Sequence, residues 1–158
     1  MTAVRTSRGG VAVGLVADMD RVEAQAVHCL RLWHGGPPAQ ARVWNDFATA
    51  LGPAAGRRAL KSVETMCGLW NRHARRPPVI RPAECPCLGA DEACFGHCVA
   101  AASDGAHDDA LIIACAMVRA DVAPLLVGLA EELGLALRRA ALAAQPRPRP
   151  PGHRGTLH

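Results

Sequence analysis

The sequence predicts an all-α fold: a compact bundle of about six helices with a flexible N-terminal arm and a Pro/Arg-rich disordered C-terminal tail. Half of the 158 residues are apolar, but the aromatic ones are only three Trp and two Phe, with no Tyr. A core built mainly of Ala, Leu, Val and Ile suits closely packed helices. Apolar residues recur at helical spacing, and no segment shows a competing alternation of the kind that is typical of a strand.

One domain is expected for a chain of this length. We assign residues 1–17 to the arm, 18–143 to a single helical domain and 144–158 to the tail. The apolar run VAVGLVA (11–17) is short and lacks a convincing cleavage site, so a secretory leader is not favoured. No apolar run is long enough to cross a bilayer. The seven cysteines are an odd number and match no secreted disulfide scaffold, so we expect a cytoplasmic protein with reduced thiols.

The first three helices are marked by apolar periodicity and by Gly and Pro at their ends. Asp20 begins the first helix, with Glu23 as its capping-box partner, and GGPP (35–38) ends it. The second helix is expected at about residues 39–51, followed by Gly52. The third has a single apolar stripe that steps by four and three residues. Its members are Gly56, Leu60, Val63, Cys67, Trp70 and Ala74.

The last three helices follow a loop at residues 77–90. Carboxylates at the start of the fourth helix, which is expected from about Asp91 to Ser103, suit the positive end of the helix dipole. The fifth helix, at about 107–119, is apolar on every side from Ala110 to Val118, which predicts that it is central and fully buried. Asp121 is expected to cap the sixth helix, in whose first turn Pro124 is tolerated.

The segment CPCLGADEACFGHC (85–98) is the best candidate for a functional site. Cys85 and Cys87 flank a proline in the loop, whereas Cys94 and Cys98 share a helix face with His97 on its flank. Thiolates that converge from the two pairs would hold a metal, with zinc favoured over an iron–sulfur cluster. The spacings of one and three residues differ from those of usual zinc sites, and no C-x₂-C element is present. Cys85-Pro86 also has the form of a heme-regulatory dipeptide.

Two other interpretations of these cysteines remain open. The first is thiol redox sensing, for which the helix N-terminus is expected to favour the thiolate of Cys94. The second is plain packing, because Cys94 and Cys98 lie in an apolar stripe and the chain places cysteines in other such stripes. The residues concerned are Cys29, Cys67, Cys94, Phe95, Cys98, Val99, Ala102 and Cys115. The loop pair has no packing reason to be cysteine, so it is the stronger functional candidate.

Charge is divided unevenly along the chain, whose net charge is +4. Residues 57–81 hold seven basic groups and one acid, and residues 84–132 hold nine acids and one basic group. Such blocks attract each other within a monomer or across a dimer, or form a nucleic-acid surface beside an acidic one. We favour the first interpretation, so the expected partner is another protein or a second copy of the chain rather than nucleic acid or a membrane.

The sequence therefore predicts a small helical binding or regulatory protein whose cysteine cluster binds a metal or senses thiol redox state. One alternative is a metal-free homodimeric interaction module with structural cysteines. Another is a DNA-binding regulator that uses the basic third helix, where Arg57, Arg58 and Lys61 follow a turn resembling that of a helix-turn-helix. The chain has no Gly-rich phosphate loop, nucleophile elbow or H-E-x-x-H motif, so an enzyme is not expected.

Overall fold

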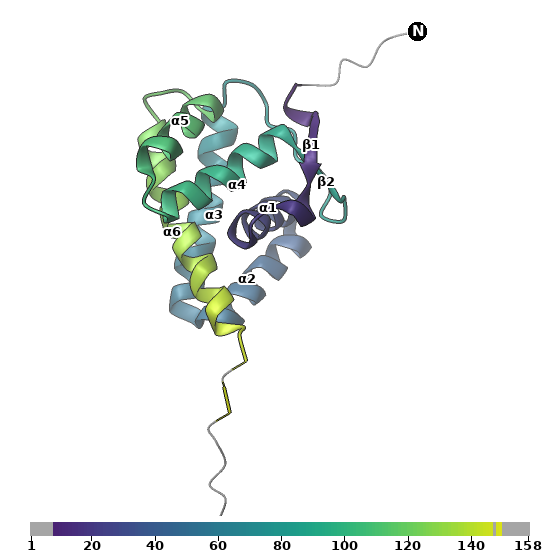
Figure 1. Ribbon diagram of the computed structural model, residues 1–158, viewed down its shortest axis with the longest axis vertical. Helices are drawn as coiled ribbons and strands as arrows, with labels where there is room; N and C mark the ends of the chain where they lie inside the picture. Colours follow the sequence, from purple (N-terminus) through teal and green to yellow (C-terminus); the bar gives the residue numbers. More distant parts are fainter. Residues whose placement is uncertain (1–7, 147, 150–158) are drawn as a thin grey trace, which may run out of the picture.

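The computed structural model describes residues 8–146, 148 and 149, and six α-helices make up most of this part of the chain (Figure 1). The all-α bundle expected from the sequence is confirmed. The helices are α1 (Arg21–His34), α2 (Pro37–Leu51), α3 (Pro53–His73), α4 (Ala90–Ser103), α5 (His107–Met117) and α6 (Ala123–Ala143). No helix in the described ranges has both the length and the apolar character that crossing a membrane requires.

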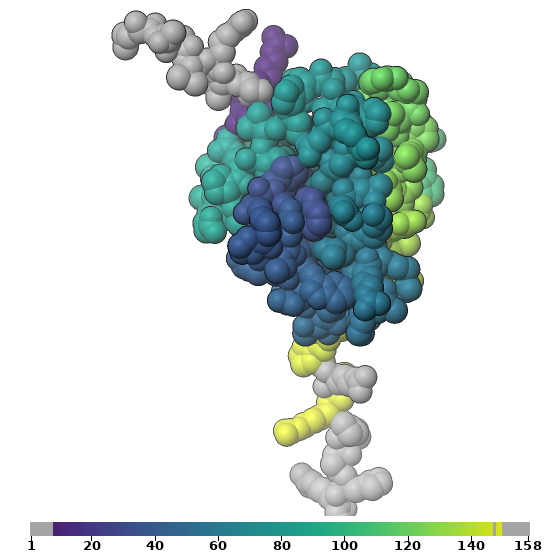
Figure 2. All heavy atoms as spheres, turned by 180° about the vertical axis from the view of Figure 1, so that it is seen from behind, coloured from purple at the N-terminus to yellow at the C-terminus, as the bar shows by residue number. Residues whose placement is uncertain are grey.

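Glycine and proline separate the first three helices. Gly36 and Gly52 have φ angles of 91° and 84°, in the left-handed region that side chains disfavour, and each directly precedes the proline that opens the next helix. With only Gly52 between them, α2 and α3 fold back on each other and lie side by side at the surface (Figure 2). Their backbones come close because Gly56 lies against Ala48, where a Cβ would be 3.0 Å from the Ala48 nitrogen.

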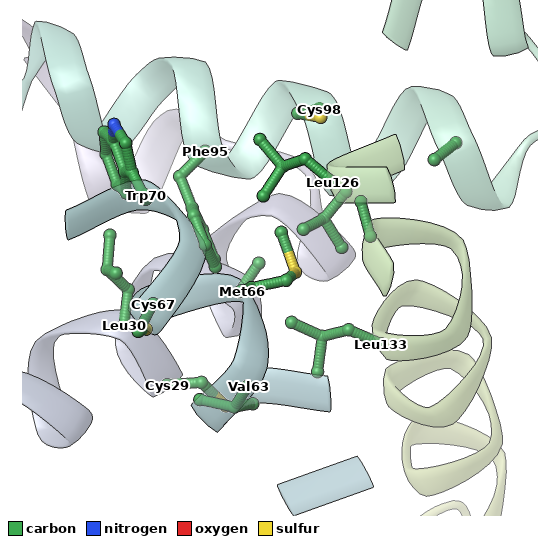
Figure 3. Packing of buried hydrophobic residues seen from close by; sticks show 14 of the residues in the cluster. Cys29, Leu30, Val63, Met66, Cys67, Trp70, Phe95, Cys98, Leu126 and Leu133 are labelled. Atoms are coloured by element: carbon green, nitrogen blue, oxygen red, sulfur yellow. The ribbon is translucent and has the colours of Figure 1, made fainter. Parts of the chain in front are cut away.

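The helix at the centre of the bundle is α4, which packs against α1, α5 and α6. Its Phe95 ring stacks on Trp70 of α3, with the ring centroids 5.8 Å apart (Figure 3). Met66, Leu126 and Leu133 complete this part of the core. The close approach of α4 and α6 depends on Gly134, where a Cβ would be 2.8 Å from the Val99 carbonyl oxygen.

The expectation that α5 is the central buried helix is wrong. Only Ala110, Ala114 and Met117 of α5 are buried, and Ile112 is 70% exposed. The helix lies at the periphery and covers one face of α4 and α6. The apolar residues on its outer side led to the expectation of burial, but in the fold this side is exposed.

Residues 8–18 differ from the arm that we expected, because they pack on the bundle as short 3₁₀ turns at Arg8–Gly10 (η1) and Val16–Asp18 (η2) around the strand β1 (Ala12–Leu15). This strand pairs antiparallel with β2 (Cys87–Gly89), and the register is irregular between Ala12 and Gly14. The strand was not expected, because its partner lies more than 70 residues away in sequence. Residues 1–7 of the expected arm, and most of the expected tail at 144–158, lie outside the described residues.

Candidate functional site

The loop that carries Cys85 and Cys87 is anchored to the bundle by a buried ion pair. Arg31 of α1 and Glu92 of α4 have side chains that are 2% and 0% exposed. The pair is bidentate, since Arg31 Nε and Nη2 donate to the two carboxylate oxygens at 2.8 and 2.9 Å. Two further guanidinium hydrogens reach the loop, where Nη1 donates to the carbonyl of Cys85 at 2.5 Å and Nη2 to that of Cys87 at 2.7 Å. Arg31 thus fixes the backbone on both sides of Pro86.

Glu92, the acidic partner in this pair, also binds the backbone of the same loop. Its carboxylate accepts the backbone N–H of Arg81 at 2.8 Å and that of Gly89 at 2.9 Å. Burial alone would raise the pKa of Glu92, but the hydrogen bonds from Arg31 and from these two N–H groups outweigh it, so the pKa lies below its ordinary value. Every described partner of this carboxylate is thus a donor, which is the arrangement that makes a buried charge tolerable.

Asp91, the neighbour of Glu92, fixes the beginning of the loop. Arg76 donates to both of its carboxylate oxygens, at 2.9 and 2.6 Å, and the Val79 N–H donates at 2.8 Å. Gly9 lies directly against this carboxylate and leaves no room for a Cβ. Arg76 belongs to the basic block and Asp91 to the acidic one, so this ion pair joins the two blocks within the monomer.

The Cys85 thiol lies in an environment that favours its ionised form. The backbone N–H of Cys87 and the guanidinium of Arg81, whose Nη1 is 4.0 Å from the sulfur, both favour the Cys85 thiolate. The Cys87 N–H, together with the charges of Arg81 and Arg31, lowers the pKa of the Cys85 thiol and outweighs the opposing effect of burial. Arg81 also donates to the Gly10 carbonyl at 2.6 Å, so it links the thiol to the N-terminal segment.

Cys87 is half-buried and begins β2, where it pairs with Leu15 of β1. Both thiols of the loop are free, and both are partly exposed. The site therefore contains two cysteines separated by one proline, on a backbone segment whose carbonyl groups are held by a single arginine. This arrangement suits chemistry that changes the bonding of the two sulfurs.

Cys94 and Cys98 lie in different surroundings from the loop pair. Cys98 is fully buried, and its thiol is 3.8 Å from the Ala110 carbonyl; burial raises its pKa to about 12. Cys94 packs against the edge of the core. The expectation that the helix N-terminus favours its thiolate is wrong, because burial and the charge of Asp91 raise the pKa of Cys94 more than Arg76 lowers it. Packing explains Cys98, as it does the buried Cys29 and Cys67.

His97 is exposed and points toward α1, where its Nδ1 lies 2.9 Å from Glu23 Oε1. Within the described residues, no three of the His, Cys, Asp and Glu side chains come together as a metal-holding group. The zinc site predicted from Cys85, Cys87, Cys94, Cys98 and His97, and its iron–sulfur and heme alternatives, stay predictions.

The basic residues Arg57, Arg58 and Lys61 lie exposed on the first turns of α3. Lys61 pairs with Glu64 at 3.2 Å on the same helix, and both groups are open to solvent. Arg58 and Lys61 border a shallow hollow between α3 and α6 together with Arg139. The DNA-binding alternative built on these residues stays a prediction.

Sequence reasoning missed Arg31, Arg81 and Glu92, the residues that shape the loop site. A signal for Arg31 is present, because it follows the buried Val27 by four residues and so lies on the inner face of α1. A basic residue at such a position needs a buried partner. The partner is 61 residues away, and the sequence does not identify it.

Comparisons of the chain with protein-family models, with curated protein sequences and with solved structures found no match.

Proposed function

We propose that this protein is a thiol-based redox sensor, in which Cys85 is the reactive thiol and Cys87 completes a reversible disulfide with it. The observation that carries the proposal is the geometry around Cys85: a partly exposed sulfur within reach of the Cys87 N–H and the Arg81 guanidinium, on a loop anchored by Arg31. A reactive cysteine needs access, a stabilised thiolate and a resolving thiol nearby.

The oxidant that we propose is a hydroperoxide. The Cys85 thiolate attacks the terminal peroxide oxygen, the O–O bond breaks, and the leaving alkoxide or hydroxide takes a proton from water; Cys85 becomes a sulfenic acid. The Cys87 thiol then attacks this sulfur, the S–O bond breaks, and water leaves with the thiol proton. Two electrons pass from the two sulfurs to the peroxide. Reduction by an external thiol reverses the change.

The anchor gives oxidation a structural consequence. A disulfide across a single proline closes a small ring and forces the backbone of residues 85–87 to adjust. Arg31 donates to the carbonyls of both cysteines and also pairs with Glu92, so this adjustment acts on the ion pair between α1 and α4. The Arg31–Glu92 pair is thus the element that would convert the state of the thiols into a change in the bundle.

Hydroperoxide titration followed by intact-mass and peptide-mass analysis tests the proposal. We expect the wild type to lose two hydrogens at low peroxide excess, with both modified thiols in the peptide that contains residues 85–87. Cys85→Ser should abolish the change, and Cys87→Ser should convert it to the gain of one oxygen at Cys85. Cys115→Ser, a half-buried thiol on α5, is the matched control and should behave as the wild type.

A disulfide that still forms in Cys85→Ser would exclude the proposed site. Zinc measured in the same anaerobically purified protein, at one atom per chain and lost in Cys85→Ser/Cys87→Ser, would favour the metal-binding alternative over the sensor. An absorption spectrum of that sample distinguishes the iron–sulfur and heme alternatives from the zinc site and from the metal-free sensor.

A further inference from the structure

A hollow of about 410 Å³ lies beside the cysteine loop, between the end of α1, the first turns of α2 and the loop residues 80–84. We call it the loop hollow, and its volume is in the range of small-molecule sites. Two arginines that line it connect it with the reactive thiol. Arg81 Nη1 is 4.0 Å from the Cys85 sulfur, and Arg31 Nη1 donates to the Cys85 carbonyl at 2.5 Å. A molecule held in the loop hollow is therefore close to Cys85.

Apolar side chains from three segments line the loop hollow. Leu32 comes from α1, Ala39 from α2 and Ile80 from the loop, where Pro82 and Ala83 extend the apolar surface. Hydrogen peroxide is small and polar, so it gains nothing from such a surface. A hydrocarbon chain does gain, because its contact with the lining removes apolar area from water. The lining therefore favours an organic ligand.

The charges of the loop hollow favour an anion. Four basic side chains line it, those of Arg31, His34, Arg42 and Arg81, and the acidic side chain in the lining is that of Glu84. Arg31 is already paired inside the bundle, and Arg81 stabilises the Cys85 thiolate. Arg42 is exposed and has no carboxylate partner in the described part of the chain. Its guanidinium can therefore bind the carboxylate of a ligand through two parallel hydrogen bonds.

We infer that the oxidant of Cys85 is an organic hydroperoxide that carries a carboxylate, such as a fatty-acid hydroperoxide. The carboxylate binds at Arg42, and the hydrocarbon chain lies on the apolar lining. The Cys85 thiolate attacks the terminal peroxide oxygen, the O–O bond breaks, and the alkoxide takes a proton from water and leaves as an alcohol. Cys85 becomes a sulfenic acid, which Cys87 converts to the disulfide with loss of water. This inference rests on the proposed function and names the substrate class of the same site.

The rates at which three hydroperoxides oxidise the full reduced chain test the inference. The probes are hydrogen peroxide, linoleic acid hydroperoxide and the methyl ester of the latter, each at low micromolar concentration. Peptide mass spectrometry follows the Cys85–Cys87 disulfide, and each rate is divided by the rate of free N-acetylcysteine with the same probe. On this scale we expect the acid to react at least about fivefold faster than its ester at low salt, with a smaller difference at high salt. Both should exceed hydrogen peroxide.

Variants of the two exposed charges in the lining test where the carboxylate binds. Arg42→Gln should lower the ratio of the acid rate to the ester rate about threefold, and Glu84→Gln should raise it. Arg57→Gln on α3 is the matched control, because Arg57 is exposed and does not line the loop hollow, and it should leave the ratio unchanged.

The outcomes separate this inference from the proposed function. Equal normalised rates for the acid and its ester overturn the inference while the sensor stands, provided that the disulfide forms. A ratio that Arg42→Gln does not change overturns it as well, and so does hydrogen peroxide that reacts as fast as the ester on the same scale. A Cys85–Cys87 disulfide that forms with none of the three probes overturns the proposed function itself.

Discussion

At the scale of the residue, the seven cysteines separate into thiols with different surroundings. Burial raises the pKa of Cys29, Cys67 and Cys98 to about 12, so these thiols stay protonated at neutral pH. The pKa of Cys85 is shifted in the opposite direction by the Cys87 N–H and by Arg81 and Arg31. Because the thiolate is the nucleophile, the native protein should present one preferred site of attack rather than seven equivalent ones.

The first prediction is that Cys85 is alkylated by iodoacetamide well before the buried thiols, and at lower pH than in the urea-unfolded chain. The lowered pKa means that its thiolate is present at a pH where an ordinary thiol is protonated. Arg81→Gln removes one of the stabilising charges and should move the rate–pH curve to higher pH, whereas Arg72→Gln, which alters a group bonded only to its own helix, should not. Peptide mass spectrometry after short labelling measures both. Identical curves for native and unfolded Cys85 would contradict the prediction.

The second prediction concerns Arg31. Arg31→Met leaves the Glu92 carboxylate buried without its cation and the carbonyls of Cys85 and Cys87 without their donor. Removing one partner of a buried pair costs about 3–5 kcal/mol, so urea unfolding should show a loss of that size. Arg138→Met removes a partly exposed pair with Asp104 and should cost less than about 1 kcal/mol. Equal losses of unfolding free energy in the two variants would show that the buried Arg31–Glu92 pair stabilises the protein no more than a surface pair does.

At the scale of the element, the packing of the bundle depends on the short distance between α4 and α6 at Gly134. Gly134 lies against Ser103 and the Val99 carbonyl, with less space than any side chain needs. Gly128 lies in the same helix, exposed, with nothing near its missing Cβ. The two glycines have the same intrinsic cost in a helix, so any difference between them reports on packing alone.

The third prediction follows from this contrast. Gly134→Ala should destabilise the protein by about 1–3 kcal/mol, because backbone atoms of α4 cannot move aside easily. Gly128→Ala should stabilise it by up to about 1 kcal/mol, since alanine favours the helix and meets nothing. Urea unfolding followed by tryptophan fluorescence measures both changes. A neutral Gly134→Ala would mean that α4 and α6 lie farther apart than described.

The helices were predictable because their signals are local. Asp20 with Glu23 opens α1, where the Asp20 N–H bonds to Glu23 at 3.3 Å, and Pro53 opens α3. The helix α2 begins at Pro37, slightly before the expected start at about residue 39. The position of α5 was not predictable, because apolar composition does not say which face is covered. The exposed Ile112 illustrates this. The strand β1 and the Arg31–Glu92 pair depend on partners far away in sequence, which periodicity and caps do not reveal.

At the scale of the whole molecule, one buried network joins α1, α4, the cysteine loop and the N-terminal segment. Arg31 and Glu92 link the two helices to the loop, and Arg81 links the loop to Gly10. The sequence analysis placed Cys85 and Cys87 in a loop with nothing to pack against. In the fold, the backbone of that loop is instead held by hydrogen bonds to the charged side chains of Arg31 and Glu92. The stability of the molecule should therefore depend on the ionisation of Glu92.

The fourth prediction is an acid-dependent loss of stability that can be assigned to this carboxylate. The pKa of Glu92 is lower in the folded protein than its ordinary value, so its contribution is fully present above the pKa of the unfolded chain, about 4.3. That contribution is lost as the pH falls through the lower, folded pKa. Glu92→Gln keeps the shape but not the charge, and at pH 7 it should cost about 3 kcal/mol.

The pH dependence of that cost is the decisive measurement. Free energies of unfolding from urea titrations between about pH 7 and about pH 3 should show the gap between wild type and Glu92→Gln narrowing below about pH 5. Other carboxylates titrate in both proteins, so the difference between the two isolates Glu92. Glu131→Gln, which removes a carboxylate paired with His107 at the surface, is the matched control and should leave the wild-type curve almost unchanged. A gap that is constant or widens toward low pH would mean that Glu92 is not held ionised by Arg31 and the loop.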